Sequence, residues 1–208
     1  MPSIVAALAL GLTACGSTDD KAAGTPGFWE AHAVTGASEV DPPTSVPAIA
    51  ERSELVVLGS IEGAEEGKDY GEEGKPTNHT SNLTIKVERA SSPDVSEAVV
   101  EFTRNPGSGL TDVVDDLPKG RYVFYLTSWY KGDDGPVYRC ASAAKCLVGV
   151  TDGTLTTPRE PEAAEDLAPP EESAGASKIA AADDDATLTL EDVYTISAAA
   201  VPSSDGGS

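Results

Sequence analysis

The chain has 208 residues, with 35 Asp and Glu against 14 Lys and Arg, and its formal net charge is −21. This excess of acid argues against a nucleic-acid-binding protein, because contacts to phosphates need clustered Lys and Arg side chains. With two His and three Cys, the chain has too few ligands for a His/Cys metal cage, and we expect no metal or other cofactor. Aromatic residues make up 5% of the chain, so a core can form over only part of its length.

The first segment, residues 1–14, has no charged side chain and contains an apolar run from position 4 to 14. A permanent transmembrane helix needs about 20 apolar residues, so this shorter run is typical of a signal peptide instead. Its end, Leu12-Thr13-Ala14-Cys15, resembles the lipobox of bacterial lipoprotein precursors. That resemblance implies cleavage before Cys15, and an acyl anchor (diacylglycerol and palmitate) that holds Cys15 on the extracytoplasmic side of the cell membrane. The alternative is a buried helix with an ordinary core cysteine.

Residues 15–45 are rich in Gly, Ser, Thr, Ala and Pro. This composition cannot bury enough apolar surface to offset chain entropy, so it predicts a lipidated flexible tether. Within it, Phe28 and Trp29 are expected to dock loosely on the domain or to be exposed, and His32 is given no ligand role.

The last segment, residues 158–208, carries 12 acidic against two basic side chains. Pro, Glu, Ala and Asp dominate it as far as position 186, which predicts an acidic and mostly disordered tail. Thr189-Leu190-Glu191-Asp192 is typical of a helix start with a capping acid and predicts a helix near 190–200. Residues 187–190 could instead add a strand.

The middle segment, residues 46–157, holds 11 of the 14 basic residues, and we place the folded domain there. A short helix over 47–53 leads into the first strand, in which Gly59 permits a bulge or a close approach. Residues 62–79 are polar and are predicted to form a solvated loop. Their carboxylates lack the ligand spacing of a calcium loop.

Short strands are predicted wherever apolar and polar side chains alternate between turn residues. They cover residues 55–61, 80–88, 98–103, 122–130, 137–140 and 146–150, and a turn at Asp152-Gly153 then leads to residues 154–156. The predicted fold is mainly β: a small OB-like barrel or sandwich of five to six strands with one or two short helices and disordered flanks. With Leu117-Pro118-Lys119-Gly120 before an aromatic strand, the order of elements resembles the small OB-type barrels of bacterial lipoproteins of unknown function.

Two cysteines remain once Cys15 is assigned to the lipid. Cys140 and Cys146 lie at the inner ends of two predicted hairpin strands. The oxidising compartment of an exported domain favours a disulfide between them. A redox pair is the alternative, but the spacing is not Cys-x-x-Cys.

Motifs for catalysis are missing from the chain. Ser108 stands in Gly107-Ser108-Gly109, which lacks the spacing of a nucleophile elbow. A Ser-His dyad would have to use His79, which lies in the predicted acidic loop and is a poor base for positioned chemistry. We therefore assign no catalytic residue.

Aromatic residues gather in one part of the domain, because six of them fall between positions 122 and 138. Tyr122 and Phe124 are expected in the core. Aromatic side chains on open strand faces are common binding anchors. The candidates for an exposed binding groove are Tyr125, Trp129, Tyr130 and Tyr138. Strict alternation along the strand puts Tyr130 on the face of Tyr122 and Trp129 on the opposite face.

The function we favour is a non-enzymatic binding module, anchored to the membrane through its lipid and displayed outside the cell. We expect a monomer that binds a protein or a glycan and no nucleic acid. One alternative is a hydrolase-type enzyme with a site assembled from carboxylates and Tyr, and another is a structural spacer lipoprotein. Carboxylates that converge beside Tyr or Arg in a deep pocket would favour the enzyme, whereas a shallow aromatic strip would favour binding.

We expect Cys15→Ala to release the protein from the membrane fraction or to leave an unprocessed precursor, because the substitution removes the acylated thiol. Metabolic labelling with a palmitate analogue checks this and should tag only the unsubstituted chain. A variant that stays equally labelled and membrane-bound would contradict the lipid anchor.

Overall fold

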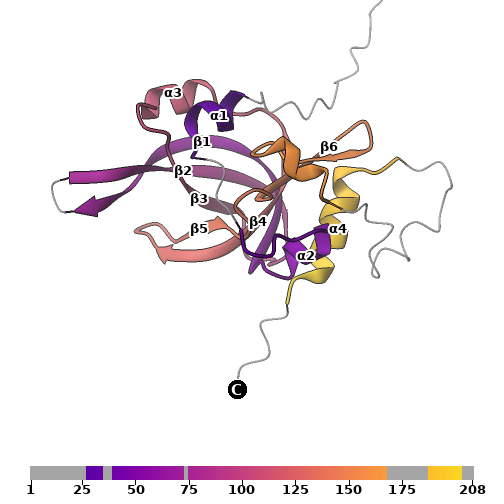
Figure 1. Cartoon of the computed structure of the whole chain (residues 1–208). Helices are drawn as coiled ribbons and strands as arrows, with labels where there is room; N and C mark the ends of the chain where they lie inside the picture. Colours follow the sequence, from indigo (N-terminus) through magenta and orange to yellow (C-terminus); the bar gives the residue numbers. More distant parts are fainter. Residues whose placement is uncertain (1–26, 35–38, 73–74, 168–186, 203–208) are drawn as a thin grey trace, which may run out of the picture.

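The computed structural model describes residues 27–34, 39–72, 75–167 and 187–202. The expected signal peptide, Cys15, and parts of the expected tether and tail lie outside these residues. The described part is mainly β, which confirms the predicted fold class, and one strongly curved sheet is its main element (Figure 1). Its strands are β1 (Leu55–Glu72), β2 (Lys75–Ala90), β3 (Glu97–Thr103), β4 (Arg121–Lys131), β5 (Pro136–Cys140), β6 (Leu147–Thr151) and β7 (Thr154–Thr156).

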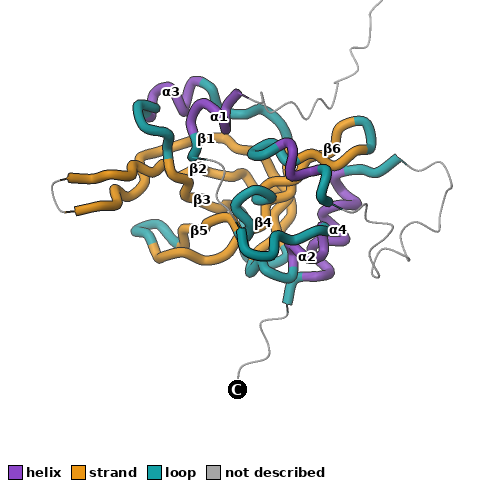
Figure 2. The backbone as a smooth tube through the Cα atoms, in the orientation of Figure 1, coloured by secondary structure: helices purple, strands orange, loops and turns teal. Residues whose placement is uncertain are grey.

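Short helices flank this sheet (Figure 2). They are α1 (Gly27–His32), α2 (Val46–Ala50), α3 (Leu110–Asp115), α4 (Leu190–Ala200) and the 3-10 turn η1 (Pro161–Ala164). None of the helices in the described ranges is both long enough and apolar enough to cross a membrane.

The strands close into a ring of five. Neighbours follow the order β1-β2-β3-β5-β4, and β1 also pairs with β4, so the sheet returns to its first strand. The β3–β5 pair is parallel and the other pairs of the ring are antiparallel. Such a five-stranded ring is the OB-like barrel expected from the sequence. β6 pairs with β4 outside the ring, and β7 pairs with β6.

Alternation along β4 serves two cores. Tyr122 and Phe124 point into the barrel, where both are buried, as predicted. Val123 and Tyr125 point to the other face, where they pack among buried side chains of α2 and α4. A strand with an apolar core on each face is apolar throughout, which explains the unbroken run of buried side chains from Tyr122 to Leu126.

The helix predicted near 190–200 is α4, and residues 187–190 form no strand. Thr189 caps the helix by accepting a hydrogen bond from the Asp192 N–H, and Asp192 in turn accepts one from the Thr189 N–H. On its buried face, the Ser197 hydroxyl lies 2.7 Å from the Tyr125 hydroxyl. The reciprocal capping pair favours the helix over the strand alternative.

Part of the expected tether is folded. Phe28 and Trp29 belong to α1 and are only 2% and 3% exposed, so the expectation that they dock loosely or are exposed is wrong. Their rings make an edge contact with each other, and the Trp29 ring makes another with Phe102 of β3. Two large aromatic side chains supply enough apolar area to hold a six-residue helix on the barrel.

The solvated loop predicted over residues 62–79 is also wrong. β1 runs to Glu72 and β2 starts at Lys75, so their outer halves form a long two-stranded arm, residues 62–72 and 75–84 (Figure 1). Repeated register shifts along β1 and β2 interrupt the alternation that would have revealed these strands in the sequence. A bidentate ion pair between Arg104 and Glu66 ties the arm to the residue that follows β3.

The disulfide predicted between Cys140 and Cys146 is present, with 4.9 Å between the two Cα atoms. The short loop that it closes is fixed further by Glu39, which accepts hydrogen bonds from the Ser142 hydroxyl at 2.9 Å and the Ala143 N–H at 2.7 Å. Closing a loop of this length stabilises the fold by about 2–3 kcal/mol.

The close approach predicted at Gly59 is confirmed. A register shift against β2 falls between Leu58 and Gly59, and a Cβ on Gly59 would lie 2.2 Å from the Lys86 carbonyl oxygen. Because backbone stands in the way, no side-chain rotation can relieve that clash.

We therefore expect Gly59→Ala to lower the free energy of unfolding by about 1–3 kcal/mol, through the forced separation of β1 and β2. Gly63→Ala is the matched control on the same strand, because its Cβ would have no neighbour closer than 3.9 Å. Urea denaturation of both variants measures the difference. Equal losses would show that Gly59 is not held against β2.

Candidate functional site

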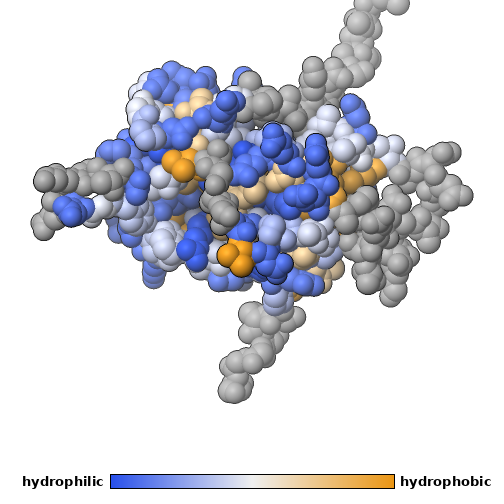
Figure 3. Space-filling view, in the orientation of Figure 1, coloured by the Kyte–Doolittle hydropathy of each residue, from blue (hydrophilic) through white to orange (hydrophobic). Residues whose placement is uncertain are grey.

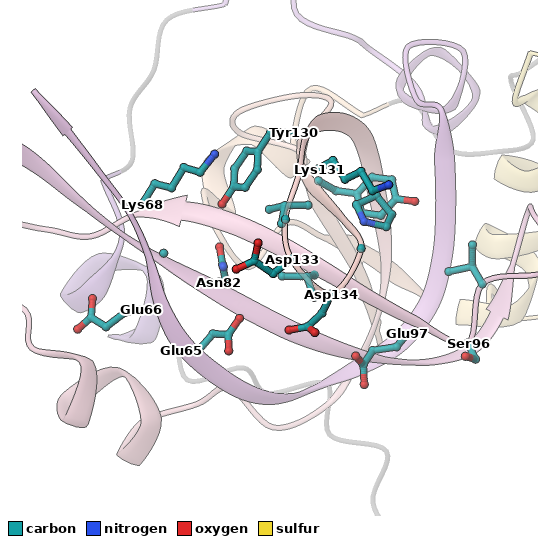
Figure 4. Close-up of a pocket in the computed structure, with 18 of the residues that line it drawn as sticks. Glu65, Glu66, Lys68, Asn82, Ser96, Glu97, Tyr130, Lys131, Asp133 and Asp134 are labelled. Carbon is teal, nitrogen blue, oxygen red and sulfur yellow. The ribbon is translucent and has the colours of Figure 1, made fainter.

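An open groove of about 720 Å³ is hollowed into the described part of the chain. It lies between the arm and the turn that joins β4 to β5 (Figure 4). We call it the groove, and residues 65–68, 82, 94–97, 99 and 130–138 line it. Its volume falls in the range of small-molecule sites, about 300–1,000 Å³.

One carboxylate, that of Glu101 on β3, organises the aromatic side chains beside the groove. Its Oε1 accepts hydrogen bonds from the Tyr70 hydroxyl at 2.8 Å and from Trp129 Nε1 at 3.1 Å. Its Oε2 accepts from the Tyr130 hydroxyl at 3.0 Å and the Thr80 hydroxyl at 3.2 Å. We call these five residues the Glu101 network. Thr80 shares its single hydroxyl hydrogen with the Lys68 carbonyl at 2.7 Å, and Trp129 shares its N–H with the Tyr70 hydroxyl at 3.0 Å. Both oxygens of Glu101 accept hydrogen bonds from the aromatic side chains, so the network holds its three rings in fixed positions.

A β-bulge explains how two consecutive residues reach the same carboxylate. In the β4–β5 pairing, Ser128 lies opposite Tyr138 and Tyr130 lies opposite Val137, which leaves Trp129 as an extra residue. The prediction from strict alternation, which put Trp129 and Tyr130 on opposite faces, is therefore wrong. A bulge turns side chains in this way because two residues of one strand face a single residue of its partner.

Cations cover two of these rings. Lys68 Nζ lies 3.4 Å from the centre of the Tyr130 ring, and the Arg139 guanidinium carbon lies 4.3 Å from that of Trp129. Burial, together with the hydrogen bond and the charge of Glu101, raises the pKa of Tyr130 to about 12. Burial and Glu101 also raise the pKa of Tyr70, so both phenols stay neutral at physiological pH.

The rest of the groove wall is acidic. Glu66 pairs with Arg104, but five further carboxylates in the groove form no ion pair within the described ranges. They are Glu65, Asp94, Glu97, Asp133 and Asp134. The groove's own cations are Lys68 and Lys131. The described residues contain no group of three or more His, Cys, Asp or Glu side chains arranged to hold a metal ion.

The four aromatic candidates from the sequence have different fates. Trp129 and Tyr130 belong to the Glu101 network, and Tyr138 is half-buried and lines the groove. Tyr125 is fully buried against α4, so its assignment to an exposed groove is wrong. Its position on β4, between two cores, accounts for the burial.

Sequence reasoning missed Tyr70 and Glu101. Tyr70 lies in the segment predicted to be a loop, and Glu101 occupies an ordinary polar position of β3. The signal that could have revealed Tyr70 is its place as a lone aromatic residue in a polar segment. No comparable signal marks Glu101, because its role depends on pairing between distant strands.

A Ser-His-Asp arrangement was also missed, because it uses His32. His32 Nδ1 lies 2.8 Å from the Ser108 hydroxyl, and its Nε2 lies 3.1 Å from Asp116 Oδ2. The N–H groups of Ser108 and Gly109 donate to Asn105 and Asp112, so neither is free to stabilise an oxyanion. The arrangement instead joins α1 to the two ends of α3. His79 pairs with Asp69 on the arm.

Comparison with known proteins adds no family to these observations. The chain matches no protein-family model, no curated protein and no solved structure. A function must therefore be argued from the groove and the Glu101 network themselves.

We expect Glu101→Gln to lower the pKa of Tyr130, because it removes both the negative charge and an acceptor that favour the neutral phenol. Glu97→Gln, a neighbouring change on β3 outside the network, is the control. Carbon NMR of the Tyr130 ring across alkaline pH measures the shift. An unchanged Tyr130 titration in Glu101→Gln would contradict the network.

The same pKa predicts how stability changes with pH. Tyr130 titrates near 10 when the chain is unfolded and at about 12 when it is folded. The contribution of Tyr130 to the free energy of unfolding is thus fully present below pH 10 and is lost as the pH rises through about 12. Unfolding of Glu101→Gln should depend less steeply on pH in that window.

Proposed function

We propose that this chain is a membrane-anchored, extracytoplasmic lipoprotein that acts as a non-enzymatic binding module, with the groove and the Glu101 network as its binding surface. The lipobox ending at Cys15 supports the anchor. The folded body supports the binding role, because the groove lies next to a group of aromatic side chains that is already fixed by hydrogen bonds.

The observation that carries the proposal is the hydrogen bonding of three aromatic side chains to the Glu101 carboxylate. Binding normally costs free energy when mobile side chains become ordered. Here Tyr70, Trp129 and Tyr130 are ordered before any ligand arrives. The site lies beside the β1–β2 and β4–β5 hairpins, the region through which OB-fold barrels hold extended ligands.

The two alternatives receive less support. A hydrolase needs a carboxylate or phenol that can exchange protons near neutral pH. Both oxygens of Glu101 already accept hydrogen bonds from the aromatic side chains, and the pKa values of Tyr70 and Tyr130 are raised. A role as a structural spacer does not account for a partly buried hydrogen-bond network beside a groove.

The polarity of the molecular surface also bears on the type of ligand. The face in Figure 3 is mostly hydrophilic, with apolar residues scattered as small separate spots. Exposed large apolar side chains in the described ranges include Trp129 of the Glu101 network. A ligand held mainly by polar and aromatic contacts fits this surface better than a broad apolar partner.

A photo-crosslinking residue at position 134, in the groove, should capture a ligand on intact cells. A benzophenone side chain reacts with C–H bonds, so protein and glycan ligands are both detectable. The matched control is the same residue at position 195, which is exposed on α4 and outside the groove.

The proposal requires adducts from position 134 that position 195 does not give, and that Trp129→Ala reduces. Identical adducts from both positions, or none from position 134, would rule out the groove as the binding surface.

A further inference from the structure

The unpaired carboxylates stand on three sides of the groove. Glu65 belongs to the arm, Glu97 starts β3, and Asp133 and Asp134 lie in the β4–β5 turn. Figure 4 shows these side chains around one opening. Like charges gathered around a concave surface focus the field there and raise the local concentration of cations. Charge alone would also suit a surface that is merely solvated, so a second observation is needed.

Asn82 supplies that observation. Asn82 lines the groove and is 8% exposed. Its side-chain amide is hydrogen-bonded to Tyr130, but its Oδ1 has no hydrogen-bond partner in the described part of the chain. A buried acceptor without a partner costs about 1–3 kcal/mol. A ligand that carries N–H donors into the groove would satisfy it.

The groove already holds one ammonium group of its own. Lys68 Nζ stacks on the Tyr130 ring at 3.4 Å. Tyr138 offers a second ring in the groove, and no cation of the described residues stacks on it. The Lys68 contact shows that an ammonium group and the aromatic wall fit together at contact distance.

We propose that the groove binds a small organic polyamine, a flexible chain with several ammonium groups. This assignment rests on the proposed function of the groove. One ammonium would stack on Tyr138 and donate to Asn82, and others would pair with the carboxylates of the rim. A metal ion fits less well, because the described carboxylates form no coordinating cluster. An anion would meet five unpaired carboxylates.

The test is calorimetric titration of the full chain, purified in a nonionic detergent, with spermine at low ionic strength. We expect saturable binding of one spermine. Three other probes identify the chemistry: Mg²⁺, the neutral sugar chitotriose and the peptide tetralysine. Binding of Mg²⁺ as tight as that of spermine would reduce the effect to counterion attraction and overturn the proposal.

Variants localise the binding. Asp133→Asn with Asp134→Asn should weaken spermine binding about tenfold, because it removes two exposed partners. Glu51→Gln with Asp152→Asn removes the same charge outside the groove and should change affinity less than about twofold. Equal effects of the two pairs would overturn the site.

A second pair of variants tests the ring. Tyr138→Leu should weaken spermine binding, whereas Tyr138→Phe, which keeps the aromatic face, should retain it. Thermal unfolding of both variants separates lost binding from lost folding. A folded Tyr138→Leu with unchanged affinity would overturn the stacking contact.

The remaining outcomes separate this inference from the proposed function. Adducts from position 134 without spermine binding would leave the groove as a binding surface and overturn the polyamine. Tetralysine binding without spermine binding would indicate that the ligand is a polypeptide, recognised through its lysine ammonium groups. Chitotriose binding alone would indicate that the ligand is a saccharide. Each overturns the free polyamine. Loss of both crosslinking and spermine binding would overturn the proposed function too.

Discussion

A single carboxylate joins three other strands of the barrel to its own strand. Glu101 is on β3, yet its hydrogen-bond donors come from the end of β1, the middle of β2 and the end of β4. The outer arm is otherwise a two-stranded ribbon, and such ribbons are only marginally stable alone. Hydrogen bonds from Tyr70 and Thr80 to Glu101 fix the arm over the barrel. The ion pair between Glu66 of the arm and Arg104, which follows β3, is a further link between the two. The groove exists because the arm is held there.

Irregularities in the strands place these groups. A regular strand sends alternate side chains to opposite faces, so regular β4 could give Glu101 either Trp129 or Tyr130 but not both. The bulge at Trp129 supplies both rings. The register shift at Gly59 helps the barrel to close. β1 pairs with both β2 and β4, so it must curve strongly, and it does so where Gly59 approaches the Lys86 carbonyl. The same local device thus closes the barrel in one place and builds the site in another.

Sequence patterns predicted what depends on short-range regularity. The strands of the ring, the disulfide and the capped helix α4 all follow from alternation, spacing or a local capping pair, and the structure contains each of them. The arm could not be predicted, because its bulges and its Gly and Glu residues hide the alternation. The burial of Tyr125 depends on α4, which is separated from β4 by about a quarter of the chain. Of the site, the rings of β4 were found and Glu101 was not, because a carboxylate gains its role only from the strands that fold around it.

The His32 arrangement and the Glu101 network are both hydrogen-bonded groups of side chains, but their surroundings differ. His32 lies between Ser108 and Asp116 at distances that would suit a nucleophile and its base. The N–H groups of Ser108 and Gly109 are already used within the turn and the helix cap, so these two do not offer hydrogen bonds to a developing negative charge. At Glu101 the donors are likewise used, but one of the rings that they hold in place, that of Tyr130, also lines the groove. The first array therefore ties α1 to the two ends of α3. The second holds the Tyr130 ring in place beside the unpaired carboxylates of the groove, and a fixed aromatic ring beside such carboxylates suits the binding of a cation.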